Sequence, residues 1–275
     1  MSYKTIMVSL ALDRANDACL AVAGDLAERF GAKVIGIAAS DLRAPLYFAE
    51  GEYAQELIDQ EEQAIRKRLS ELEAEFRRSI QQRAKSVEWR SALAPQVPYV
   101  IQEARAADVL VAASRAEAIV DPDNAADPND LVMLAGRPVV VVPPASQWLD
   151  LRSVLVAWKD VREARRAVFD ALPILAAAKT VTVVEIPEPD TDRAAALSHV
   201  EDVASWLLGH GIVASSFVTE TSNDVTTKLD EISANVGAGL VIAGAYGHSR
   251  LREWILSGVS RHLTTVSSRC SFLSH

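Results

Sequence analysis

The residues whose types and spacing suggest chemistry lie near the C-terminus, where a short apolar run ends in two glycines. The run at 240–243 is followed by Gly244 and Gly247, and nine residues after Gly247 comes the segment Ser257-Gly258-Val259-Ser260. Glycine lets backbone N–H groups approach an anion because no Cβ stands in the way. A helix that begins at this segment adds unpaired N–H donors and a partial positive charge. The spacing therefore predicts a phosphate-binding loop.

Side chains around these glycines could reinforce phosphate binding. The hydroxyls of Ser257 and Ser260 can donate hydrogen bonds, although Ser257 could equally cap the helix. His248 and Arg250 add nearby positive charge. The alternative reading of the same pattern is that the two glycines only turn the chain and that the serine only caps a helix.

Other motifs of nucleotide binding and catalysis are absent from the sequence. The chain contains no GxxxxGK[ST], no GxGxxG after a first strand and no GxSxG. The acidic segment 121–127 lacks the central glycine and the closing glutamate of a calcium loop. The sequence therefore argues against a Walker-type NTPase, a dinucleotide-binding enzyme and a serine hydrolase, and it leaves any metal ligands unknown.

The elements that position these residues form the second of two similar halves. Each half opens with a short β-branched run, continues through a helical stretch into a second run, and later has a helix, a further run and a terminal strand. The paired runs are 4–10 with 152–158, 33–37 with 180–186, 109–112 with 240–243, and 138–142 with 270–273. Uninterrupted β-branched runs are typical of strands buried on both faces, and alternation with helices indicates a parallel sheet. We predict an α/β fold of two tandem doubly wound domains, each with about five strands and helices on both faces.

The boundary between the halves and one long helix can also be predicted. Pro143 and Pro144 cannot continue a strand ladder, which gives domains at 1–144 and 150–275. Residues 53–83 have apolar side chains along one stripe and charges elsewhere, which predicts an amphipathic helix with pairs such as Glu62–Arg66. The five scattered tryptophans are expected to be packing residues and not a stacking platform.

Composition limits the function classes. The chain has 275 residues, 49% of them hydrophobic, and a net charge of −9, which opposes broad contact with nucleic acid. Its apolar runs are far shorter than the roughly 20 residues that span a bilayer, so we expect no membrane contact and a cytoplasmic location. Cys19 and Cys270 are expected to be buried, reduced thiols.

The glycine pattern near the C-terminus resembles the signature of a known family. The pattern Gly244-x2-Gly247-x9-Ser257-Gly258 is similar to the ATP-binding signature Gly-x2-Gly-x9-Gly-(Ser/Thr) of the universal stress protein family, and the resemblance covers nearly the whole chain as a tandem pair. The resemblance implies five-stranded doubly wound domains whose last strands pair antiparallel, so that the two halves form a pseudo-two-fold pair within one chain. Further self-association into a homodimer stays open.

The resemblance also implies roles for particular residues. Around the phosphates it places Gly244, Gly247, Ser257, Gly258, Val259 and Ser260. Near adenine and ribose, at the ends of the first two strands of this half, it places Trp158, Lys159, Asp160, Val183 and Val184. Two positions depart from the family pattern: Ser257 replaces a glycine, and Lys159 stands where an acidic or Asn residue is common.

The first half has lost the signature. It has no glycine between Gly51 and Gly136, and Asp121, Asp123 and Asp127 lie in the corresponding loop, where they would repel phosphate. We therefore predict that only the second half binds a nucleotide. The functional hypothesis is a stress-response regulatory protein that binds ATP, with or without Mg or Mn, and hydrolyses it slowly at most. The alternatives are a nucleotide-free scaffold and, less favoured, an ATP pyrophosphatase.

Overall fold

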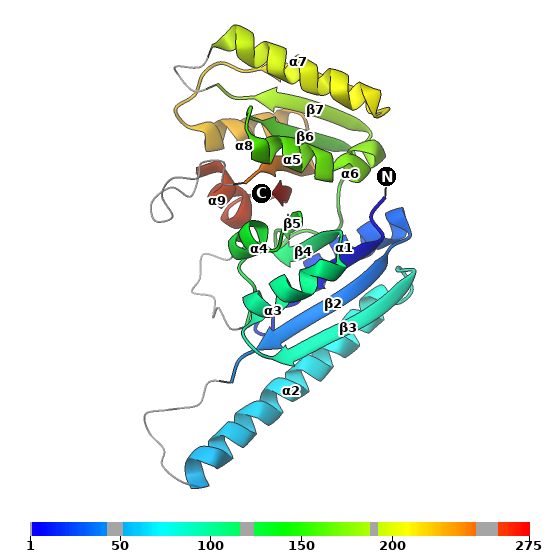
Figure 1. The fold of residues 1–275 in the computed structure, drawn as a ribbon, viewed down its shortest axis with the longest axis vertical. Coiled ribbons are helices and arrows are strands. Elements are labelled where there is room, and N and C mark those ends of the chain that lie inside the picture. Colours follow the sequence, from blue (N-terminus) through cyan, green and yellow to red (C-terminus); the bar gives the residue numbers. More distant parts are fainter. Residues whose placement is uncertain (1, 43–51, 116–123, 188–191, 246–257) are drawn as a thin grey trace.

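The computed structural model describes residues 2–42, 52–115, 124–187, 192–245 and 258–275. Within these residues ten strands form one sheet, in the order β3-β2-β1-β4-β5-β10-β9-β6-β7-β8. The strands are β1 (Thr5–Ser9), β2 (Lys33–Ser40), β3 (Ser86–Leu93), β4 (Val109–Ala113), β5 (Val139–Val142), β6 (Ser153–Trp158), β7 (Thr180–Glu185), β8 (Ala214–Val218), β9 (Leu240–Gly244) and β10 (Cys270–Ser274). Figure 1 shows the sheet running through the whole molecule.

Each half of the sheet is parallel and doubly wound. The first half has the strand order 3-2-1-4-5, and the second half repeats it as 8-7-6-9-10 read from the other end. Within each half every neighbouring pair is parallel, from β1 with β2 and β4 to β9 with β6 and β10. The predicted tandem α/β fold is therefore confirmed, and the strand order changes direction at β1 and β4 and at β6 and β9.

The two halves join through one antiparallel pair at the centre of the sheet. β5 pairs with β10, with Val140 opposite Phe272 and Val139 opposite Leu273. All four residues of β5 are buried, and Phe272 is fully buried. The pairing relates the halves by a pseudo-two-fold and leaves no unpaired strand edge between them.

Helices cover both faces of this sheet. Behind one face lie α1 (Asp17–Phe30), α2 (Glu52–Ile80), α5 (Arg162–Asp170), α6 (Leu172–Ala177) and α7 (Arg193–Gly209). Behind the other lie α3 (Gln96–Glu103), α4 (Pro128–Leu134), α8 (Val225–Asn235) and α9 (Gly258–Thr265), and a 3-10 turn (Ala104–Ala106) follows α3. Alternate residues of each strand supply the two apolar layers, as expected for strands buried on both faces.

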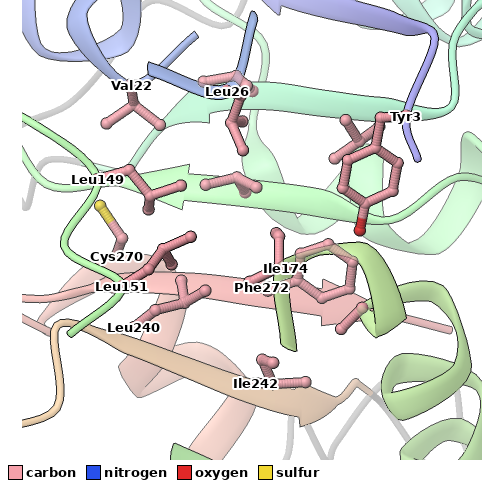
Figure 2. Packing of buried hydrophobic residues seen from close by; sticks show 14 of the residues in the cluster. Tyr3, Val22, Leu26, Leu149, Leu151, Ile174, Leu240, Ile242, Cys270 and Phe272 are labelled. Carbon is pink, nitrogen blue, oxygen red and sulfur yellow. The ribbon is translucent and has the colours of Figure 1, made fainter. Parts of the chain in front are cut away.

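A shared core fills the space where the halves meet (Figure 2). Side chains from the N-terminal strand region, α1, the connection between the halves, α6, β9 and β10 converge there, with the labelled residues Tyr3, Val22, Leu26, Leu149, Leu151, Ile174, Leu240, Ile242, Cys270 and Phe272. The Tyr3 hydroxyl donates a hydrogen bond of 2.6 Å to the backbone carbonyl of Asp170. The two halves are therefore packed as one body.

The long amphipathic helix is present as α2. Its stripe residues Leu72, Phe76 and Ile80 are fully buried, and the Arg66 Nε to Glu62 Oε1 distance is 2.7 Å. Both cysteines are buried and free. None of the helices in the described ranges is long and apolar enough to cross a membrane.

Two of the tryptophans expected to be packing residues are largely exposed. Trp148 and Trp206 are 56% and 41% exposed. Trp148 lies in the connection between the halves, and Trp206 lies on the outer part of α7. Scattered tryptophans carry no periodic signal, so these two could not be distinguished from Trp158, which is 8% exposed.

Candidate functional site

A cavity of ≈ 450 Å³ lies at the carboxyl ends of β6, β7 and β9. Its remaining walls come from the N-termini of α8 and α9 and from the start of α5. Ligands of open α/β sheets bind beyond the carboxyl ends of the strands, where the strand order changes direction. β6 and β9 are the neighbouring strands at that point, so the cavity occupies the expected position.

The N-terminus of α9 faces this cavity. Gly258 is the first residue of the helix, and both Gly258 and Val259 line the cavity. The first backbone N–H groups of a helix have no partner within the helix and attract anions. Among the described atoms, a Cβ at Gly258 would meet only the Cγ2 of Thr226 at 3.8 Å, so the described residues leave space beside this glycine.

Gly244 also borders the cavity, but packing explains why it is a glycine. A Cβ at this position would lie 2.4 Å from the backbone nitrogen of Ala164 and 2.5 Å from the carbonyl carbon of Glu163. These atoms belong to the first turn of α5, which cannot move without shifting the helix. The missing side chain of Gly244 therefore lets α5 pack closely on β9.

Asp224 gives the cavity a carboxylate that the sequence reasoning missed. It is the N-cap of α8, where its Oδ1 accepts hydrogen bonds from the backbone N–H of Thr227 and the hydroxyl of Thr226, and its Oδ2 accepts one from the hydroxyl of Thr227. These hydrogen bonds, led by those from Thr227, lower the pKa of Asp224 to about 2. The segment Ser222-Asn223-Asp224 is a recognisable helix start, but the sequence does not show that this start reaches the cavity.

The predicted site residues fall into three groups. Six line the cavity: Trp158, Lys159, Val184, Gly244, Gly258 and Val259. Three do not: Val183 is buried in the apolar layer on the other face of the sheet, Ser260 is 1% exposed within α9, and Asp160 pairs with Arg165 at 2.6 Å. Gly247, His248, Arg250 and Ser257 lie outside the described residues.

The corresponding place in the first half is nearly filled. The cavity at the carboxyl ends of β1 and β4 measures only ≈ 70 Å³. Here the carboxylate of Asp127 accepts a hydrogen bond of 2.9 Å from the backbone N–H of Asn129 at the start of α4 and binds Arg115 at 2.9 Å. Pro128 begins the helix and has no N–H to offer. The first half therefore satisfies this helix start with its own carboxylate, whereas in the second half the residues that immediately precede Gly258 lie outside the described ones.

Comparison with solved structures places this architecture among known folds. A universal stress protein from Archaeoglobus fulgidus DSM 4304 superposes with a TM-score of 0.71 at 15% sequence identity, over 98% of this chain and 95% of that chain. The chain has the universal stress protein fold. No protein-family model and no curated protein matches the sequence.

Two further structures support the same assignment of the fold. A candidate universal stress protein from Pseudomonas aeruginosa UCBPP-PA14 gives a TM-score of 0.62 at 14% identity, over 99% of this chain and 93% of that chain. A functionally unknown protein from Pseudomonas aeruginosa PAO1 gives 0.60 at 13% identity, over 99% and 92%. All three comparisons cover both halves, so the similarity to universal stress proteins extends to the tandem arrangement.

Proposed function

We propose that the second half binds ATP in the cavity between β6, β7, β9, α8 and α9, and that the protein is a nucleotide-controlled regulatory module of the stress response. The observation that supports this most directly is the contrast between the halves. The second half has a cavity of ≈ 450 Å³ beside the start of α9, whereas the first half has ≈ 70 Å³ at a helix start capped by Asp127. The domains proposed at 1–144 and 150–275 therefore have different roles.

The residues suggest how the nucleotide would lie. The phosphates would face the N-terminus of α9, where Gly258 and Val259 supply backbone donors and the helix dipole favours negative charge. The adenine would lie toward the end of β7, beside Val184 and Ile186. Asp224 stays ionised at neutral pH, so its negative charge would repel the phosphates. Its carboxylate would instead accept hydrogen bonds from the ribose hydroxyls.

The same residues indicate a binding protein more than an efficient hydrolase. The pKa of Asp224 is too low for a general base that works near neutral pH. Mg or Mn would enter, on this proposal, as an ion carried by the phosphates. We expect any hydrolysis to be slow.

A charge placed at the helix start tests the site. Gly258→Asp would put a carboxylate at the first position of α9, where the helix dipole favours it, so the fold should be retained. Like charges about 4 Å apart near a protein surface repel by on the order of 4 kcal/mol, so ATP affinity should fall at least tenfold. The measurement is isothermal titration calorimetry of the full chain with ATP and Mg.

Gly209→Asp is the matched control. Gly209 is the last residue of α7, it is exposed, and no described atom lies within 4 Å of the position that its Cβ would take. This variant carries the same extra charge and should bind ATP like the wild type. The proposal fails if the wild type shows no binding at millimolar ATP or if both variants bind equally, and the scaffold interpretation then takes its place.

A further inference from the structure

A second cavity, of ≈ 530 Å³, lies on the opposite face of the second half. Its walls come from α5, α7 and the end of β6. The apolar lining consists of Trp158, Val168, Phe169, Val203 and Trp206, and the polar lining consists of Asp160, Arg165, His199 and Asp202. Among the described lining residues, the two cavities share only Trp158. Its size falls within the range of about 300–1,000 Å³ that is usual for small-molecule sites.

The difference between the two halves explains why this space is open. In the first half α1 packs against α2, whose residues Leu72, Phe76 and Ile80 are fully buried. In the second half α5 has only nine residues and ends at Asp170, and α7 buries only Ala196, Val200 and Leu207. The two helices therefore stand apart over the sheet, and large apolar side chains such as Phe169 and Trp206 remain 50% and 41% exposed beside the gap.

Two buried polar side chains without hydrogen-bond partners in the described part of the chain lie in or beside the wall of this cavity. Trp158 is 8% exposed, and its Nε1 has no hydrogen-bond partner among the described residues. Beside it on β7, Glu185 is 6% exposed, and its Oε2 lies 3.7 Å from the Nδ1 of His199, too far for a hydrogen bond. A buried N–H that lacks an acceptor is costly, so a group that accepts its hydrogen bond would be stabilised there.

We propose that this cavity binds a planar aromatic molecule, neutral or cationic, whose hydrogen-bond acceptor reaches the indole N–H of Trp158. Phe169 and Trp206 would pack on the faces of the ring system. The site is distinct from the proposed nucleotide site, because it lies behind the other face of the sheet and is walled by α7 instead of α8 and α9, although both cavities touch α5 and Trp158.

The charged side chains around the cavity determine which ligand charge is favoured. Asp160 and Arg165 form an ion pair at 2.6 Å and neutralise each other. Asp202 adds a carboxylate to the wall, and Glu185 is the residue of β7 that is paired with the wall residue Trp158. Burial raises the pKa of Glu185, while the neighbouring His199 opposes that shift. This surplus of carboxyl groups disfavours an anion and favours an uncharged or positively charged ring.

One neutral dye and one anionic dye test the proposal on the full chain. Nile red is neutral, planar and carries a carbonyl acceptor, whereas 8-anilinonaphthalene-1-sulfonate is aromatic and anionic. We expect saturable one-to-one binding of Nile red, measured by its fluorescence, and at least tenfold weaker binding of the sulfonate. Nonsaturable binding of Nile red, or equal affinity for both dyes, overturns the proposal.

Three variants and one control locate the dye. Val203→Phe fills the cavity and should weaken Nile red binding at least tenfold. Phe169→Ala changes a half-exposed wall residue, so it should fold even if Val203→Phe does not, and it should also weaken binding. Trp158→Phe keeps a ring but removes the N–H, which should cost about fivefold. Leu208→Ala changes a residue of α7 that is 61% exposed and outside the cavity, so it should bind like the wild type.

The comparison of dye affinities between the cavity variants and the control variant decides whether the proposal stands. Equal losses in the cavity variants and in Leu208→Ala would mean that the dye coats the surface, and no loss in the cavity variants would mean that it binds elsewhere; either result refutes the proposal. Gly258→Asp should keep its full affinity for Nile red, so a failure at the nucleotide site is distinguished from a failure here.

Discussion

Replacing Gly244 by alanine is the sharpest test of why that glycine is present. If Gly244 only lets phosphate approach, one added methyl group should weaken ATP binding and leave stability unchanged. The structure predicts a different result, because the added Cβ would lie 2.4 Å from the backbone nitrogen of Ala164 and 2.5 Å from the carbonyl carbon of Glu163. Backbone atoms of α5 cannot rotate away as a side chain could.

The expected cost follows from overpacking. Forcing an extra methyl group into a close-packed contact typically costs about 1–3 kcal/mol, and we expect the upper half of that range because both close contacts are backbone atoms. At about 2–4 °C per kcal/mol this lowers Tm by roughly 4–12 °C. Gly258→Ala is the control, since its Cβ would make only an ordinary contact with Thr226 at 3.8 Å and should change the free energy of unfolding by less than about 0.5 kcal/mol.

The assay is urea denaturation of the two variants beside the wild type, followed by circular dichroism, with the slope of the transition compared as well as its midpoint. Gly244→Ala should unfold at a lower urea concentration than Gly258→Ala. If the two variants are equally stable, the packing of α5 on β9 does not require a glycine at 244, and the argument from the close approach is wrong.

Two other predictions concern the shared core. Phe272→Ala removes a fully buried ring from the β5–β10 junction and should cost about 3–5 kcal/mol, with both halves losing stability together in differential scanning calorimetry; a loss confined to one transition would show that the halves unfold independently. Burial raises the pKa of Cys19 to about 12 from its ordinary value of 9.0. The unfolded chain therefore loses this proton first as pH rises, so stability should be intact below pH 9 and fall between pH 9 and 12, and Cys19→Ala should flatten that decline, as measured by denaturation across this pH range.

The parts of the fold that could be predicted from the sequence are those with a strong burial signal. Runs such as Val139–Val142 are β-branched throughout because both faces of a central strand are covered. The third strand of each half carried no such signal. β3 contains Glu88 and Arg90, which form an ion pair at 2.6 Å, and β8 alternates half-buried and exposed residues over its first four positions before the buried Val218. Strands at the outer edge of a sheet keep polar side chains, so they look like loops in a sequence.

The candidate site shows the same division. The spacing of glycines predicted where β9 ends and α9 begins, and the structure places Gly244 and Gly258 beside one cavity. It could not show that Asp224 reaches this cavity, because that depends on how α8 packs over the sheet. The sequence also could not predict the cavity between α5 and α7. Trp158 and Trp206 both line this cavity, but that depends on how far apart the two helices lie over the sheet.

The pairing of β5 with β10 has a consequence for how copies of this chain could assemble. Both terminal strands are occupied inside the molecule, so the outer strands β3 and β8 are the only sheet edges of the described structure that remain available for extension. These edges lie at opposite ends and differ in sequence, one rich in ion pairs and the other in serine. Joining unlike edges head to tail would build an open filament. A closed homodimer would instead pair like edges, β3 with β3 or β8 with β8, or form through the helices.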